Sequence, residues 1–186
     1  SMLPMMFIHS SFVSTSSTPL THQPTDVRVS IQQNEVTNPS NPNVHSIEEF
    51  NALNGTIESL VVASGSCSDN SITELKMNQF TQLRVLDIGN ECFARVKVFE
   101  MIGMHALETV RVGTSCFLNK GGVFRLKDCQ RVRELRIGCL SFSDYSSCDL
   151  ESVPSLEVIE IGDLKERSYN FYPASLELRS EREEGH

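Results

Sequence analysis

The fold is decided by an eight-residue motif that occurs three times: LDIGNECF at residues 86–93, VRVGTSCF at 110–117 and LRIGCLSF at 135–142. The glycines of these motifs, and Gly162 after them, follow one another at intervals of 24, 25 and 24 residues. Aliphatic residues keep the same places before each glycine, in an L-x-x-L-x-L spacing. A repeat of about 20–29 residues with this spacing indicates a solenoid in which each repeat forms one coil.

Each motif contains a short strand with one buried face. Leu86 and Ile88 alternate with the polar Asp87, and this period of two is typical of a strand that is half buried. The glycine that follows ends the strand, and we expect it to have a positive φ. The phenylalanine that closes each motif is predicted to point inward, so that Phe93, Phe117 and Phe142 form a column of rings.

A second apolar pattern recurs at the same period and predicts a second inward-facing strand in each coil. It consists of the pairs Leu75/Met77, Phe99/Met101, Phe124/Leu126, Cys148/Leu150 and Leu176/Leu178. No helical stripe of ten residues fits between the two patterns. We therefore predict a mainly β solenoid of about five coils over residues 46–180, followed by a charged tail at 181–186.

The segment before the solenoid has a different composition. Residues 1–45 are rich in Ser, Thr, Pro and Asn, and such a segment lacks the apolar density for a core of its own. Within it, Val27, Val29 and Ile31 alternate in a way that suits one strand. LPMMFI at 3–8 has no basic residue before it, unlike a secretory signal. This slightly favours a cytoplasmic location and leaves secretion open.

A short helix is predicted at the start of the solenoid, in SIEEFNALNG at 46–55. Ser46 can accept a hydrogen bond from the backbone near Glu49, while the Glu49 side chain reaches back to Ser46. Asn54 and Gly55 supply a helix stop. We expect this helix to cap the first coil, because the end of a solenoid must be shielded from water.

The coils resemble leucine-rich repeats. The Ile-Gly-x-x-Cys/Ser-Phe motif followed by Phe-x-Leu-x-x-Cys is similar to the bacterial-surface-antigen (BspA-like) type of bacteria and protists, over roughly residues 57–180. The resemblance implies a protein-binding module or, alternatively, a structural or adhesion fragment of a longer cell-surface protein. The common form of the repeat stacks an asparagine ladder after the strand. The corresponding residues here are Glu91, Ser115 and Leu140, so we expect no such ladder.

The six cysteines allow three disulfides in any of 15 pairings, or metal ligation. Cys92 and Cys116 occupy equivalent places in adjacent coils, about 4.8 Å apart, whereas a disulfide prefers Cβ atoms about 3.8 Å apart. No Cys-x-x-Cys pair is present to favour a metal site. We predict reduced cysteines that pack as small apolar residues in the core.

Charge and motifs argue against several classes of function. The net charge of −8 disfavours nucleic acid as a partner, and no apolar run approaches the roughly 18 residues of a membrane span. The sequence contains no G-x-S-x-G, P-loop or G-x-G-x-x-G motif, and His105 is the one histidine among the coils. We therefore predict neither an enzyme nor a bound cofactor or metal, and expect a protein as the partner.

The outward positions of the first strand in each coil are the candidate binding residues. They are Val85, Asp87, Thr109, Arg111, Glu134, Arg136, Val158 and Glu160. The alternative is a solvated face whose opposite charges only pair across strands. Arg111 and Arg136 lie at equivalent positions, and like charges there repel unless Glu134 comes between them.

The last coil departs from the pattern. After Gly162 the column position falls on Glu166, and Tyr169 or Phe171 is expected to refill it. Tyr169 and Tyr172, where exposed, are further candidates for contact with a partner, because tyrosine is enriched at interfaces. We also expect an apolar end and an unpaired strand edge after the last coil. Further coils, or a homodimer through this C-terminal coil end, would cover them.

Overall fold

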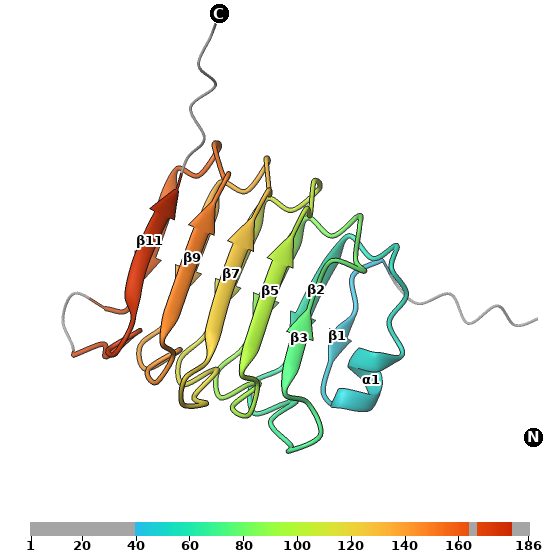
Figure 1. Cartoon of the computed structure of the whole chain (residues 1–186). Coiled ribbons are helices and arrows are strands. Elements are labelled where there is room, and N and C mark those ends of the chain that lie inside the picture. Colours follow the sequence, from blue (N-terminus) through green and yellow to red (C-terminus); the bar gives the residue numbers. More distant parts are fainter. Residues whose placement is uncertain (1–39, 164–166, 180–186) are drawn as a thin grey trace, which may run out of the picture. The chain divides into compact units, whose positions relative to one another are not determined.

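The computed structural model describes residues 40–163 and 167–179. These residues form a parallel β-solenoid in which each coil gives one strand to each of two sheets (Figure 1). The strands of sheet A are, in spatial order, β1 (Asn43–Val44), β2 (Ser59–Val62), β4 (Val85–Ile88), β6 (Thr109–Val112), β8 (Glu134–Ile137) and β10 (Val158–Ile161). The strands of sheet B are β3 (Glu74–Lys76), β5 (Val98–Ile102), β7 (Val123–Lys127), β9 (Ser147–Glu151) and β11 (Ser175–Arg179). The prediction of a mainly β solenoid with about 24-residue spacing is confirmed.

The sequence repeat becomes a structural register. Leu86 pairs with Val110 in sheet A, and Phe99 pairs with Phe124 in sheet B. Every strand therefore meets its equivalent from the next coil, with inward residues beside inward residues. The buried positions include both predicted apolar patterns from Leu60 to Leu150, so the core lies between the two sheets.

The prediction of a positive φ is confirmed at Gly162, with φ 77°, and is wrong for the three earlier motif glycines. Gly89, Gly113 and Gly138 do not have a positive φ. They pack against one another instead: a Cβ on Gly138 would lie 2.6 Å from the carbonyl carbon of Gly113, and a Cβ on Gly113 would lie 2.7 Å from that of Gly89. Since real Cβ atoms do not approach backbone so closely, glycine is required where the backbones of successive coils approach each other.

In the turns after β4, β6, β8 and β10, two non-glycine residues have a left-handed φ, whereas the turn after β2 uses Gly65 and Cys67. In one coil, Glu91 has φ 58° and Phe93 has φ 53°; the next coil repeats this with Ser115 and Phe117. Leu140 and Phe142, then Tyr169 and Phe171, repeat it again. The left-handed phenylalanine conformation turns each ring into the core at the same height.

The predicted column of rings is present and is longer than the three motifs. Phe117 stacks on Phe93 at 5.6 Å between ring centroids and on Phe142 at 4.7 Å. Phe171 stacks on Phe142 at 5.0 Å, so it refills the column in the last coil. Glu166, the residue at the expected spacing, lies outside the described residues.

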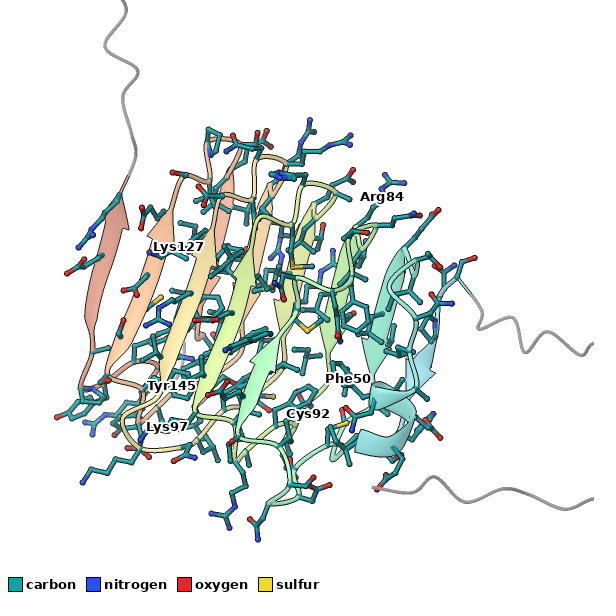
Figure 2. All side chains as sticks on the ribbon, turned by 45° about the vertical axis from the view of Figure 1, so that its right-hand side comes forward. Phe50, Arg84, Cys92, Lys97, Lys127 and Tyr145 are labelled. Carbon is teal, nitrogen blue, oxygen red and sulfur yellow. The ribbon has the colours of Figure 1, made fainter. Side chains whose placement is uncertain are left out.

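The N-terminal end of the solenoid is closed by helix α1 (Ile47–Asn51). Ser46 accepts a hydrogen bond from the Glu49 N–H at 3.2 Å, as predicted. The Glu49 carboxylate, however, accepts from the His45 N–H at 2.7 Å, and the helix ends at Asn51 rather than at residues 54–55. Phe50 packs edge-on against Phe93, 5.8 Å between centroids, and so covers the end of the ring column (Figure 2).

The solenoid begins earlier than residue 46. Strand β1 pairs in parallel with β2, through Asn43 to Val61 and Val44 to Val62, because Val44 buries its side chain beside the first coil. The strand predicted around Val27–Ile31, the 3–8 segment and the tail at 181–186 lie outside the described residues.

The six cysteines are free thiols, five of them buried and Cys139 half-buried. Cys129 and Cys148 occupy inward core positions, as their place in the repeat predicted. Burial raises the pKa of Cys148 to about 12, so its thiol stays protonated and packs as a small apolar group.

Next to the ring column, a ladder of side chains ties each coil to the preceding one. Cys116 Sγ donates to the Gly89 carbonyl at 3.1 Å, and Ser141 Oγ donates to the Gly113 carbonyl at 2.6 Å. In the last coil, Asn170 Nδ2 donates to the Gly138 carbonyl at 2.7 Å. The backbone N–H of Cys116 in turn donates to Ser141 Oγ at 2.9 Å. A ladder therefore exists one residue after the positions considered from sequence, with sulfur and hydroxyl replacing most of the amides.

Candidate binding surfaces

The eight predicted residues of the solenoid face lie together on the outside of sheet A. Asp87, Arg111, Arg136 and Glu160 are paired in register along one row. Val85, Thr109, Glu134 and Val158 form a second row in the same way. All eight are exposed or half-buried. We call this set the sheet A face.

The two arginines of the sheet A face share one carboxylate. Glu134 Oε1 lies 2.9 Å from Arg111 Nε and 2.7 Å from Arg136 Nε, and Arg136 also pairs with Glu160. Glu134 thus comes between the two cations, so their repulsion is offset. Hydrogen bonds from Arg136 and Arg111 hold the pKa of Glu134 below its usual range.

A shallow groove runs along the glycine row beside these charges. Its volume is about 370 Å³. Four glycines, Gly89, Gly113, Gly138 and Gly162, lie along it, together with Asn90. The side chains that line it from the sheet A face are Asp87, Arg111, Arg136 and Glu160. Within the described chain, the Asp87 carboxylate has no cation within 4 Å. A partner could therefore reach both exposed backbone and charges of both signs.

The outside of sheet B has a more complete pattern of ion pairs. Arg125 pairs with Glu100 on one neighbouring strand and with Asp149 on the other, and Lys127 pairs with Glu151 at 2.6 Å (Figure 2). Opposite charges that alternate across strands satisfy one another. This face fits the solvated alternative better than the sheet A face does.

The tyrosines divide into two kinds. Tyr145 is fully buried, and its hydroxyl donates to the Val96 carbonyl at 2.7 Å, so it belongs to the core (Figure 2). Tyr169 and Tyr172 are 46% and 80% exposed and meet edge-on at 6.2 Å. They flank Phe171 in the turn that leads to β11, and the sheet A face does not include them.

The chain matches no protein-family model, no curated protein and no solved structure.

The sequence predicted an exposed apolar end at the last coil but not which residues are exposed there. Ile159 occupies the inward place that Leu135 fills in the preceding coil, where Leu135 is 0% exposed; Ile159 is 45% exposed. Ile161, next along β10, is only partly buried. The repeat could have indicated this exposure, since within the described chain no strand pairs with the outer edge of β10.

The described residues contain neither a grouped set of metal ligands nor a membrane-spanning helix. Nowhere in that part of the chain do three His, Cys, Asp or Glu side chains come together as a metal-binding group. No described helix is long and apolar enough to cross a membrane. His105 lies exposed in a turn.

Proposed function

We propose that the chain is a non-catalytic protein-binding module of the leucine-rich repeat, BspA-like kind, which binds through the sheet A face. The observation that carries the proposal is the register of eight outward side chains over adjacent strands, beside a groove along which four glycines lie. A rigid sheet holds these groups in fixed positions, so little conformational entropy is lost when a partner binds.

The composition of the sheet A face favours a protein as partner. Val85, Thr109 and Val158 offer apolar surface, while Asp87, Arg111 and Glu160 offer charges of both signs. Such a mixture suits a protein surface, whereas a nucleic acid requires a predominantly basic one. The net charge of −8 also opposes binding to phosphate backbones.

The proposal is tested by comparing two double variants in proximity labelling followed by mass spectrometry. Arg111→Glu/Arg136→Glu reverses the cations of the sheet A face, and Arg125→Glu/Lys127→Glu reverses the same number on sheet B. We expect the first variant to lose a specific partner and the second to retain it, with both giving native circular dichroism spectra. A partner that is lost equally from both, or from neither, contradicts this surface.

The alternative function, a structural or adhesion fragment of a longer cell-surface protein, rests on the resemblance of the repeats. It differs from the first in what it requires of the gene, namely a secretion signal upstream of these coils. Sequencing the full open reading frame and localising the product by surface biotinylation distinguish the two. A product protected from the reagent in intact cells contradicts the adhesion function.

A further inference from the structure

The C-terminal coil presents an open end in the described part of the chain. Strand β10 is the last strand of sheet A, and β11 is the last of sheet B, so no described strand pairs with the outer edge of either. Ile159 is exposed there, and a depression of about 750 Å³ extends from Thr114 across β10 to Asp163. Exposed apolar surface beside free strand edges is a site for association with another chain.

The opposite end of the solenoid is covered over its ring column and over sheet A. Helix α1 covers the ring column through Phe50, and β1 occupies the edge of β2, while β3 is the edge strand of sheet B (Figure 1). A second copy therefore cannot stack its C-terminal end on this N-terminal end without displacing the helix. Copies of the chain are left with an isologous contact, C-terminal end to C-terminal end, which closes as a dimer about a two-fold axis.

We propose that two copies of this chain pair through the edge strands of their last coils, with β11 antiparallel to the β11 of the second copy. A two-fold axis perpendicular to both the solenoid axis and the strands reverses the strand direction, so an edge strand meets its own copy antiparallel. The backbone N–H and C=O groups of both edges are then paired, and Ile159 is removed from water.

The charges on β11 select one register. Glu177 and Arg179 lie on the same exposed side of the strand. If the two-fold axis passes through residue 178, Glu177 of each copy lies opposite Arg179 of the other copy. If the axis passes through residue 177 or 179, two like charges lie opposite each other. A shift of one strand by an odd number of residues would place outward side chains opposite inward ones. The strand is thus self-complementary in a single register.

Within one copy, Glu177 already pairs with Arg179 of the same strand. In the register centred on 178, the two Glu177–Arg179 pairs of the two copies lie side by side, so each carboxylate has an arginine on its own strand and another on the strand opposite. The exposed pair Tyr169 and Tyr172 lies in the same last coil, and tyrosines of this kind are typical of protein interfaces.

The test is sedimentation velocity on the whole chain over a range of concentrations, with a set of charge variants. We expect the wild type to show a concentration-dependent monomer–dimer equilibrium. Arg179→Glu and Glu177→Arg each set like charges opposite each other and should weaken the dimer about tenfold. The double variant Glu177→Arg/Arg179→Glu restores opposite charges and should return the dissociation constant to within about threefold of wild type.

Lys76→Glu provides the matched control, because Lys76 is an exposed cation on β3, the edge strand of sheet B at the capped end. It should leave the dimer unchanged. A wild type that stays monomeric at every concentration overturns the proposal. A dimer that Lys76→Glu weakens as much as Arg179→Glu, or that the double variant fails to restore, overturns it as well. None of these readouts requires a partner at the sheet A face.

Discussion

The ring centroids of Phe117 and Phe142 lie 4.7 Å apart, and the two ring planes are within 2° of parallel. Phe99 of sheet B also stacks on Phe117, with 4.6 Å between ring centroids. Phe117 therefore joins the ring column to the second sheet. Phe117→Ala should lower the free energy of unfolding by about 3–5 kcal/mol, measured by urea denaturation.

The adjacent Leu118 supplies the control, since it is 36% exposed. Leu118→Ala should cost no more than about 1 kcal/mol. A melting temperature of the Phe117→Ala protein within one degree of wild type would mean that the ring column does not stabilise the coils.

The strands could be predicted because the repeat shows each inward position several times. One copy of Leu-Asp-Ile is ambiguous, but four copies in step define a face and a period. The reason for the glycines could not be predicted in the same way. Their crowding arises between Gly89, Gly113 and Gly138 of different coils, and the motif is equally compatible with a positive φ.

Similar limits apply to the candidate site. Alternation identified which side chains point outward, and the structure places all of them on one face. The alternation could not show that Glu134 bridges two arginines, because that contact depends on side-chain rotamers. The sequence also could not distinguish the buried Tyr145 from the exposed Tyr172. Gly122 leaves the space that the Tyr145 ring occupies, since a Cβ on Gly122 would lie 2.4 Å from that ring.

Gly113→Ala tests the close approach of the coils. The added Cβ would lie 2.5 Å from Asn90 Oδ1 and 2.7 Å from the Gly89 backbone, so the coils must separate locally. We expect a loss of about 1–3 kcal/mol, measured by thermal and urea denaturation. Ser115→Ala, two residues away in the same turn, should cost less than half as much. Equal losses in the two variants would argue against a special role for Gly113.

The ion pairs of Glu134 should make the free energy of unfolding depend on pH in the acidic range. Its pKa is held low in the folded state by Arg136 and Arg111, so the unfolded chain binds this proton more readily. The stabilisation is therefore complete above the unfolded value, about 4.3, and is lost as the pH falls through the folded value. Glu134→Gln should lower the melting temperature at pH 7, and the difference from wild type should shrink as the pH falls toward 3. A difference that is constant over this range would contradict the ion-pair assignment.

The ladder beside the ring column predicts which substitutions Cys116 tolerates. Its Sγ donates to the Gly89 carbonyl and accepts from the Cys92 N–H. In the following coil the hydroxyl of Ser141 makes the two equivalent hydrogen bonds, to the Gly113 carbonyl and from the Cys116 N–H. Cys116→Ser keeps a donor and an acceptor and should change the free energy of unfolding by less than about 1 kcal/mol. Cys116→Val matches the thiol more closely in polarity but leaves both backbone groups unpaired, and should cost about 1–3 kcal/mol. Chemical denaturation under reducing conditions measures both. If valine were tolerated better than serine, the thiol would be acting only as an apolar filler, and the ladder would contribute no stability.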